Sequence, residues 1–497
     1  MAGSCLWHLV KNGLLLALSL VLLPLSTAAI AAISLWASLA IGSKRKEPPW
    51  PKPKTILVTG VSMSKGLTLA RLFHQRGHRV IGADFHALAL GRVSCAIDRF
   101  CALPRPALGQ DDDVDEDDDY VLGLLRLVKE EGVDLWLSVS DVTAALHDAV
   151  AKEVIETQTL AKAVQLSLAH VKMLHEKDSF MQHCKSLGLP LPDTLVVNSS
   201  SAIVQHLTDN GGLQHHAEKS HYLVKPIGVN DVARFSMPLL PLVSEQETLW
   251  RIEAIPFGEK PAYILQEFID GPEFCTHALV IKGQVRAFVA CPSSDLLVHY
   301  TALPPESPLS HKMLAFTQTM AQAAGEQWTG HVSFDFLAKA AEKGADADVY
   351  PIECNPRVHT AIVLFNDTPA LVDEYLAVLD PAWSTADGAE KGADKGPLYP
   401  RNPQQYYWVG QDLVEGVLCP MMEMLVFKTT SRAQFRRSLR CFINRLRQWK
   451  DGTFELWDPW PWWWLYHIYW PVQFLGYMMR RRWQRINVST GKAFQAE

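Results

Sequence analysis

The chain lacks the cysteine spacings that typify zinc-binding and disulfide-linked proteins. Its nine cysteines include no Cys-x-x-Cys pair, and their number is odd. A structural zinc site or a small disulfide framework would need paired cysteines at regular spacing. We therefore expect reduced thiols, as in a protein whose folded part lies in the cytosol.

A strong excess of one charge is also missing. The chain has 47 Lys and Arg against 53 Asp and Glu, a formal net charge of −6, and an isoelectric point near 6.3. Proteins that bind nucleic acid usually present basic surfaces, so we expect no nucleic acid partner. With 48% hydrophobic and 20% charged residues over 497 positions, the chain can build a sizeable core in roughly two to four domains.

Common short motifs for nucleotide binding and hydrolysis are absent as well. Gly60 and Gly66 lie six positions apart, which fits neither the dinucleotide-binding fingerprint nor the phosphate loop of P-loop proteins. No Gly-x-Ser-x-Gly motif supports serine hydrolysis. His299, His331 and His359 are therefore expected to be core or wall residues and not catalytic bases.

A long apolar stretch lies near the N-terminus. Leu14–Ile41 contains 28 residues without a charge, more than the roughly 20 needed to cross a bilayer. The alternative is a cleaved signal sequence, although the stretch is too long for a signal-peptide core. Lys44-Arg45-Lys46 outweighs Lys11 before the stretch, which favours a cytosolic C-terminal side. We expect residues 1–46 to be a single-pass membrane anchor with the rest of the chain facing the cytosol.

The C-terminal end is rich in tryptophan and arginine. Trp457–Trp483 contains seven tryptophans, and indole rings favour the headgroup layer of membranes. We expect residues 406–455 to be a helical extension and residues 456–497 a segment that contacts membrane lipid, while a second span or a helix packed on the protein remain alternatives. Upstream, the sequence predicts a helix with an apolar stripe on one side and a basic face on the other. The stripe consists of Phe435, Leu439, Ile443, Leu446 and Trp449. The basic face consists of Arg436, Arg437, Arg440, Arg445, Arg447 and Lys450.

Alternating strand and helix patterns follow the proline-rich residues 48–53. Residues 54–60 are typical of a buried parallel strand, 66–76 of a helix and 77–84 of a second strand, and the pattern recurs up to residues 134–140. We expect a parallel-sheet domain over residues 47–165. Residues 111–119, with eight acidic side chains in nine, are expected to be a solvated loop, and residues 381–405 a linker.

Polar residues suited to phosphate and magnesium chemistry occur within apolar segments further along. Lys225 lies in an apolar strand pattern, Asp335 alternates with phenylalanines, and Glu353 and Asn355 are two positions apart. Residues two apart on a strand share a face, and their oxygens are ligands that Mg²⁺ accepts. Two neighbouring carboxylates repel unless a cation lies between them. Arg357 offers a planar fork of donors to phosphate or carboxylate, or alternatively a structural ion pair with one of the acids.

The linear order of these segments resembles the ATP-grasp superfamily over residues 55–375. Gly271-Pro272-Glu273-Phe274 is similar to the D-alanine–D-alanine ligase pattern, and Glu353-Cys354-Asn355-Pro356-Arg357 to the carbamoyl phosphate synthetase pattern. The sequence departs from relatives in having one glycine in residues 228–234, and Ser333 where D-alanine ligases carry arginine. These departures leave open the form of the phosphate-covering loop and disfavour a dipeptide-ligase pocket.

The resemblance implies a role for each matching residue. Lys177 and Lys225 would contact ATP phosphates. Gln266 and the backbone of Glu267, Phe268 and Ile269 would contact the adenine edge, and Glu273 the ribose. Mg²⁺ or Mn²⁺ would be held by Asp335, Glu353 and Asn355, with Glu353 between two ions, and Arg357 would steady an acyl phosphate or its carboxylate precursor.

The expected fold class is α/β and α+β: a parallel-sheet domain, then a two-lobed ATP-grasp domain over residues 166–380. The resemblance implies a ligase that joins a small-molecule carboxylate to an amine through an acyl phosphate, with a looser likeness to ligases of specialised metabolism. Three alternatives stay open. The first is carboxylation or phosphate transfer, although biotin-dependent carboxylation lacks support because no biotin-carrying Met-Lys-Met segment is present. The second is phosphorylation of an enol oxygen, as in mycosporine-type ligases. The third is a membrane-tethered nucleotide-binding scaffold without turnover.

Overall fold

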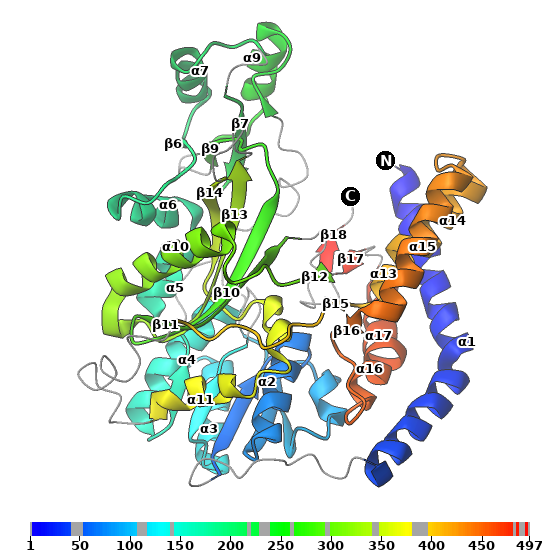
Figure 1. Cartoon of the computed structure of the whole chain (residues 1–497). Coiled ribbons are helices and arrows are strands. Elements are labelled where there is room, and N and C mark those ends of the chain that lie inside the picture. The colour runs from blue at the N-terminus through cyan, green and yellow to red at the C-terminus, as the bar shows by residue number, and fades with distance from the viewer. Residues whose placement is uncertain are drawn as a thin grey trace.

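The computed structural model of the chain shows a mixed α/β protein with three parts. A parallel-sheet domain lies below two mixed lobes, and a group of C-terminal helices lies beside them together with the N-terminal helix (Figure 1). The predicted fold class is confirmed. The structure describes residues 2–40, 53–106, 117–139, 144–215, 220–227, 239–258, 263–293, 299–339, 347–379, 396–480, 484–486 and 493–495.

The first domain is built on a five-stranded sheet in the order β3-β2-β1-β4-β5, with every pair parallel. Its central residues Ile56, Leu57 and Val58 are fully buried, because helices cover both faces of a parallel sheet. The predicted strands at 54–60 and 77–84 are confirmed, and the helix between them begins at Ser64. The elements are β1 (Thr55–Thr59), α2 (Ser64–Gln75), β2 (Arg79–Asp84), η1 (Leu90–Val93), β3 (Arg99–Ala102), α3 (Asp119–Glu131), β4 (Leu135–Leu137), α4 (Ala145–Gln158) and β5 (Lys162–Val164).

Two four-stranded sheets form the lobes above this domain (Figure 1). The smaller lobe has the order β6-β9-β7-β8 and carries two helices; its elements are β6 (Thr194–Val197), α7 (Ser200–Asp209), β7 (Tyr222–Pro226), β8 (Leu239–Leu240), α9 (Glu245–Glu253) and β9 (Tyr263–Glu267). The larger lobe has the antiparallel order β11-β10-β13-β14; its elements are α5 (Leu168–His175), α6 (Lys177–Ser186), β10 (Glu273–Ile281), β11 (Gln284–Pro292), α10 (Pro308–Ala324), β13 (Gly330–Lys339) and β14 (Asp348–Asn355).

The larger sheet has one apolar and one polar face, as the alternation along β13 predicts. Phe334 and Phe336 are fully buried, and the Phe334 ring lies 5.1 Å from that of Phe316 on α10 and 5.9 Å from that of Phe180 on α6. Asp335 lies between them in sequence and therefore points to the opposite face. Helix η5 (Thr360–Phe365) packs on β10 and β11, and α11 (Ala370–Leu376) follows it.

Two long C-terminal helices each contain π-helical turns. The first runs through α13 (Val409–Leu413), η7 (Val414–Leu418), α14 (Cys419–Met422) and η8 (Glu423–Phe427), and the second through α16 (Trp460–Trp464), η9 (Leu465–Tyr469) and α17 (Trp470–Met479). Pro420 and Pro471 follow η7 and η9, and a proline cannot donate to the carbonyl four residues before it. The Gly416 carbonyl instead accepts a hydrogen bond from Ser438 Oγ on α15 (Arg432–Gln448), at 2.7 Å.

The small sheet β12-β15-β16 connects this C-terminal region to the larger lobe. β12 (His299–Tyr300) pairs with β15 (Tyr406–Tyr407), which pairs with β16 (Lys450–Asp451). A two-stranded sheet, β17 (Gln484–Ile486) with β18 (Ala493–Gln495), ends the described chain. Arg445, predicted to lie on the basic outer face of α15, instead donates from Nε to Asp412 at 2.9 Å, because that carboxylate is buried and needs a cationic partner.

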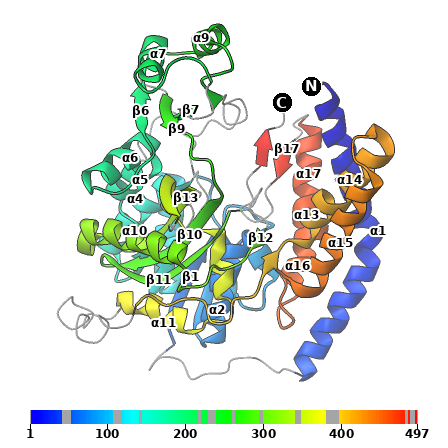
Figure 2. The same cartoon turned by 45° about the horizontal axis from the view of Figure 1, so that its top comes forward.

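The N-terminal helix α1 (Ala2–Ala40) runs along α16, η9 and α17 (Figures 1 and 2). Residues 9–39 are long and apolar enough to cross a membrane, with mean hydropathy 2.4. Polar contacts join the two elements. Ser26 Oγ lies 2.7 Å from His467 Nε2, and Trp463 Nε1 donates to Thr27 Oγ1 at 3.0 Å. The described part of the tryptophan-rich segment thus packs on α1.

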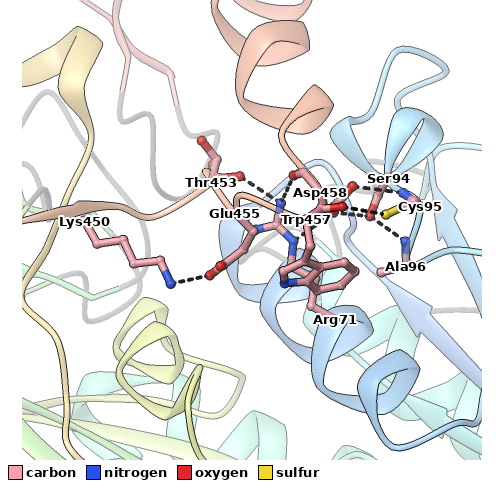
Figure 3. Close-up of polar contacts among 9 residues, drawn as sticks. All are labelled: Arg71, Ser94, Cys95, Ala96, Lys450, Thr453, Glu455, Trp457 and Asp458. Atoms are coloured by element: carbon pink, nitrogen blue, oxygen red, sulfur yellow. Dashed lines mark hydrogen bonds and ion pairs between the residues drawn. The ribbon is translucent and has the colours of Figure 1, made fainter. Parts of the chain in front are cut away.

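A buried ion pair fastens the C-terminal extension to the parallel-sheet domain (Figure 3). Arg71 on α2 donates from Nε to Asp458 Oδ2 at 2.9 Å, and both side chains are at most 3% exposed. Ser94 Oγ and the Cys95 N–H also donate to the Asp458 carboxylate, at 2.6 and 2.9 Å. Arg71 Nη2 donates to the carbonyls of Thr453 and Asp458. Each oxygen of Asp458 therefore has a donor, as a buried carboxylate requires.

Candidate active site

Acidic side chains meet where β13 pairs with β14. Asp335 lies directly opposite Glu353, and Ser333 opposite Asn355. The register shifts just after Asp335, where Ile352 is the extra residue of a β-bulge. Pro351 has no N–H to give to the ladder and β14 is an edge strand, so the bulge is tolerated there. The structure therefore brings the three predicted metal-binding residues together.

The amide of Asn355 connects the acidic pair to Arg357. Its Nδ2 donates to Asp335 Oδ2 at 3.1 Å, and its Oδ1 accepts from Arg357 Nη2 at 2.7 Å. The Arg357 N–H also donates to the Asn355 carbonyl, at 2.8 Å. The guanidinium is thus held beside the carboxylates, as the sequence predicts. For Asn355 to give its oxygen to a metal, the amide must turn over, which exchanges these two contacts.

The donor set suits a cation that is only partly coordinated by protein. Across the described parts of the chain, no three His, Cys, Asp or Glu side chains converge on one point. Asp335 and Glu353 supply two carboxylates and Asn355 one amide oxygen. Mg²⁺ usually takes few protein oxygens and fills the remaining positions with water and phosphate. Two paired, half-buried carboxylates fit such an ion because it offsets their mutual repulsion.

The smaller lobe brings Lys225 and Gln266 together across β7 and β9. Lys225 Nζ donates to Gln266 Oε1 at 2.6 Å. Gln266 is 1% exposed, and its Nε2 donates to Thr194 Oγ1 at 3.2 Å. The Lys225 ammonium is thus half-buried and held against the amide oxygen of Gln266.

In the segment predicted to contact the adenine edge, two backbone N–H groups already donate hydrogen bonds within the protein. The N–H of Glu267 donates to the Asp193 carbonyl at 2.7 Å, and that of Phe268 to the His221 carbonyl at 2.6 Å. An adenine edge would therefore be bound by carbonyl groups of this segment or by the N–H of Ile269. The side chain of Ile269 is 2% exposed and that of Phe268 is 38% exposed.

Glu273 opens β10 on the same face as Asp335. It pairs with Leu337, while Cys275, two residues on, pairs with Asp335. The Glu273 side chain is exposed and available to a ligand. The preceding turn needs a glycine, because a Cβ on Gly271 would lie 1.8 Å from the Ala338 carbonyl oxygen.

Lys177 is the first residue of α6, which begins after Glu176 in extended conformation and ends at Ser186. The sequence predicts a polar helix that opens near His175 and ends near Gly188, in agreement with α6. Helix α6 packs against β14, the strand that carries Glu353 and Asn355. The predicted phosphate-covering loop, residues 228–234, lies outside the described residues.

One buried lysine near the site was missed by the sequence analysis. Lys65 on α2 is 1% exposed and donates from Nζ to the carbonyl of Val358 at 2.9 Å. Val358 directly follows Arg357, so the parallel-sheet domain helps to position that arginine. The available signal was a lysine in the first turn of a helix that follows a buried strand.

Neutral histidines form the wall behind these charges. Burial, and secondarily the Lys65 ammonium, lowers the pKa of His277 to about 3. Burial likewise lowers the pKa of His331 and His359 well below the usual value. Both are buried, as expected of core residues, and His299 contacts Asp412 at 3.0 Å. With their pKa values lowered, the rings of His277, His331 and His359 are uncharged at neutral pH.

No family model and no curated protein matches the chain. Among solved structures, it is similar to N5-carboxyaminoimidazole synthetase from Staphylococcus aureus complexed with ADP, at 14% identity over 63% of this chain and 73% of that chain, with a TM-score of 0.44. It is also similar to an L-amino acid ligase from Bacillus licheniformis, at 15% identity over 63% of this chain and 68% of that chain, with a TM-score of 0.40. A third similar structure is the biotin carboxylase domain of Hydrogenobacter thermophilus 2-oxoglutarate carboxylase, in complex with MgADP, ADP and bicarbonate. The identity is 13% over 66% of this chain and 69% of that chain, and the TM-score is 0.44. These proteins are ATP-grasp enzymes, the superfamily that the sequence resembles. At TM-scores below 0.5, the likeness alone decides neither the fold nor the activity of this chain.

Proposed function

We propose that the chain is an ATP-dependent ligase of the ATP-grasp kind that joins a carboxylate to an amine. The observation that carries this proposal is the convergence of Asp335, Glu353, Asn355 and Arg357 on one face of the larger sheet. The Lys225–Gln266 pair on the smaller lobe adds a cation suited to phosphate. ATP and Mg²⁺ or Mn²⁺ are the proposed cofactors.

The residues of the larger sheet would handle negative charge. Asp335 and Glu353 would hold the metal ion, with Asn355 as a third ligand once its amide has turned. When bound, the ion would neutralise charge that builds up between the phosphates. Arg357 would place its planar fork against the acyl phosphate or the carboxylate that forms it.

The residues of the smaller lobe would hold the nucleotide. Lys225 would contact phosphate, Gln266 and residues 267–269 the adenine, and Glu273 the ribose hydroxyls. Lys177, at the start of α6, would be a second contact to phosphate. These contacts orient ATP and are not themselves chemical steps.

In the proposed reaction, a carboxylate oxygen of the acid attacks the γ-phosphorus of ATP. The bond from that phosphorus to the β–γ bridging oxygen breaks, giving ADP and an acyl phosphate. The amine nitrogen then attacks the acyl carbon, phosphate leaves, and the nitrogen loses a proton to give the amide. The protein's part is to position the reactants and to stabilise charge, so no covalent enzyme intermediate is needed.

Other activities remain as outcomes of the same test. A carboxylase, or an enzyme that phosphorylates an enol oxygen, would use the same nucleotide site with a different acceptor. A scaffold without turnover would bind ATP and release no ADP. The closely paired carboxylates favour a bound cation, because such a pair without one destabilises the fold, and ADP release then distinguishes an enzyme from a scaffold.

The test uses the full chain in detergent, with ADP release measured against pooled carboxylic acids and amines. Glu353→Gln should lower turnover at least about 100-fold because it removes a metal ligand that supplies several kcal/mol of charge stabilisation. Glu326→Gln is the matched control, since Glu326 is exposed on η4 (Gly325–Gln327) and is not one of the proposed site residues. The proposal fails if calorimetry on folded protein detects no magnesium-dependent ATP binding.

We further propose that α1 is retained as a membrane anchor and that the catalytic part faces the cytosol, where ATP is available. The contacts of Ser26 and Thr27 with His467 and Trp463 support retention, because cleavage would expose these partners. Edman sequencing of the mature protein and protease protection in sealed vesicles test the two statements separately. A mature N-terminus beyond residue 40 would show that α1 is a signal sequence.

A further inference from the structure

One side of α1 is covered by protein over a distance greater than the thickness of a bilayer core. Along the helix, Asn12, Ile30 and Ala37 are 1%, 2% and 7% exposed. At about 1.5 Å per residue, the stretch from Asn12 to Ala37 is about 37 Å long. The hydrocarbon core of a bilayer is about 30 Å thick. If α1 stood upright in a membrane, folded protein would therefore lie beside it through the whole core.

The elements that cover α1 are fastened to the parallel-sheet domain. Trp463 on α16 donates to Thr27 of α1 at 3.0 Å, and the neighbouring Trp464 donates from Nε1 to the Leu88 carbonyl at 2.9 Å. Helix α16 also packs on η1, where Arg92 is exposed. An upright α1 would bring packed elements of this kind into hydrocarbon, where charged side chains are costly. The packing of α1 thus argues against the single crossing that the sequence predicts.

The side of α1 that faces away from the protein is an unbroken apolar stripe. Val21, Leu25 and Leu39 are 74%, 71% and 80% exposed. The polar side chains of Ser26 and Thr27 contact the C-terminal helices instead. This is the reverse of the pattern in a helix that lies on a surface facing water. We call the exposed residues the α1 stripe, which recurs at helical spacing and includes Leu14, Val21, Leu25, Ala32, Leu35 and Leu39.

Helix α17 continues this apolar surface. It packs beside α1, and Val472, Leu475 and Met479, three and four positions apart, are 49%, 50% and 73% exposed. Two neighbouring helices therefore present large apolar side chains outward. A contiguous exposed surface of this kind indicates contact with lipid or with another protein. Its neighbours in the fold distinguish between these two.

Basic side chains on α15 favour lipid as the partner. This helix lies on the same side of the molecule as α1 in both views (Figures 1 and 2), and it contains no acidic residue. Five of its arginines are exposed and, within the described residues, make no ion pair or hydrogen bond. Such a helix complements the anionic head groups of a cytosolic leaflet. The five are Arg432, Arg436, Arg437, Arg440 and Arg447.

We propose that α1 lies along one leaflet of a membrane and does not cross it. The α1 stripe and the exposed side of α17 enter the acyl layer, and the arginines of α15 contact anionic head groups. A helix about 10–12 Å wide that is immersed to half its width reaches about 5–6 Å into the leaflet, a depth typical of interfacial helices. Both ends of α1 then lie on the cytosolic side. This inference rests on the proposed retention of α1 and is independent of the ligase activity.

Glycosylation of the full chain, translated with sealed microsomes, tests the topology. The natural acceptor Asn198-Ser199-Ser200 is exposed on the smaller lobe, and a second acceptor is added ahead of Met1. Both should stay unmodified, and external protease should remove an epitope tag placed ahead of Met1. A cleavable signal sequence fused in front is the control, because it should make the added acceptor glycosylated.

The alternatives give different glycosylation patterns. If α1 crosses the membrane, the added acceptor is glycosylated and Asn198 is not, which overturns the inference but keeps the anchor. Glycosylation of Asn198 overturns both the inference and the proposed cytosolic position of the catalytic part. Loss of the added acceptor with residues 1–40 would show a cleaved signal sequence and would also overturn the inference.

Flotation of the full chain with vesicles tests the lipid contact itself. Leu25→Glu places a charge in the α1 stripe and should lower the bound fraction at least about 10-fold. Leu160→Glu is the matched control, since Leu160 is 99% exposed on the parallel-sheet domain. Vesicles with phosphatidylserine should bind more chain than vesicles of phosphatidylcholine alone, because of the α15 arginines. Equal binding of the two variants, or of the two kinds of vesicle, would overturn the proposed contact.

Discussion

Replacing Asp458 with asparagine should destabilise the chain far more than an ordinary charge removal. The change keeps the shape of the side chain but leaves the Arg71 guanidinium buried without its carboxylate. Breaking a buried ion pair by removing one partner costs roughly 3–5 kcal/mol. Arg71 keeps its bonds to the carbonyls of Thr453 and Asp458, so we expect the lower end, about 3 kcal/mol.

The asparagine amide adds a geometric conflict to the lost charge. Arg71 Nε and Ser94 Oγ both donate to Asp458 Oδ2, and the Cys95 N–H donates to Oδ1. One of these oxygens becomes an NH₂ group, so at least one donor must face another donor. Ser94 can rotate its hydroxyl to accept, whereas Arg71 and the Cys95 N–H cannot. The conflict therefore remains on whichever oxygen is replaced.

The assay is thermal unfolding followed by tryptophan fluorescence in nanodiscs. Trp457 stacks on His74 of α2, with ring centroids 5.8 Å apart, and reports locally on this contact. At about 2–4 °C per kcal/mol for a unit of 150–250 residues, a loss of about 3 kcal/mol lowers Tm by about 6–12 °C. Asp373→Asn is the matched control, because Asp373 is 41% exposed in its pair with Arg76 and such pairs contribute at most about 1 kcal/mol.

Equal Tm shifts for Asp458→Asn and Asp373→Asn would refute this reasoning, because they would mean that the Arg71 pair is no better buried than the Arg76 pair. A second variant distinguishes charge burial from loss of packing. Changing Arg71 to Met and Asp458 to Leu together removes both charges, and such replacements are often neutral. The double variant should therefore recover part of the stability that Asp458→Asn loses.

Three further predictions concern the site and its surroundings. Arg357→Lys should lower kcat at least about 10-fold while leaving ATP affinity unchanged, since lysine lacks the planar fork; an equal loss of ATP affinity in calorimetry would contradict the proposed role. Burial lowers the pKa of His277 in the folded state from 6.5 to about 3. Between these pH values His277 is therefore protonated only in the unfolded state. Its contribution to the free energy of unfolding is constant above pH 6.5 and falls as the pH drops below 6.5. At about 1.4 kcal/mol per pH unit, the free energy of unfolding falls by about 2 kcal/mol between pH 6.5 and pH 5. In denaturant titrations between pH 7 and pH 5, His277→Gln should reduce this fall. An unchanged dependence on pH in the variant would contradict the burial of a neutral His277. Burial, and secondarily the Asp458 carboxylate, raises the pKa of Cys95 to about 12. Iodoacetamide at pH 8 should therefore label exposed Cys441 on α15 well before Cys95, and Asp458→Asn should speed the labelling of Cys95. Similar initial rates at the two cysteines would contradict the raised pKa of Cys95.

The proximity of the proposed metal-binding residues was predictable because strand alternation is a local rule. Asp335 and Glu353 lie directly opposite each other on neighbouring strands, and the apolar residues between them in sequence fix which face they share. The contact of Lys65 with the Val358 carbonyl joins residues 293 positions apart. Such a contact depends on how two domains dock, and no local pattern predicts it. The same holds for Arg71 and Asp458, at 387 positions.

The boundary between α5 and α6 carries no strong local signal. Neither a proline nor a glycine marks it, yet Glu176 is extended, with φ −79° and ψ 128°, between the two helices. The polar helix predicted to open near His175 agrees with α6, whereas the apolar helix α5 before it was not predicted.

A chain of specific contacts links α1 to the larger lobe. Ser26 of α1 contacts His467, and the neighbouring Tyr466 donates from its hydroxyl to Asp451 Oδ2 at 3.2 Å. Asp451 lies on β16, and β15 joins that strand to β12 of the larger lobe. Each step is a specific contact between ordered groups, so rotation of the lobe relative to α1 would break hydrogen bonds. If α1 is held in a membrane, these contacts fix the orientation of the active site relative to the bilayer surface.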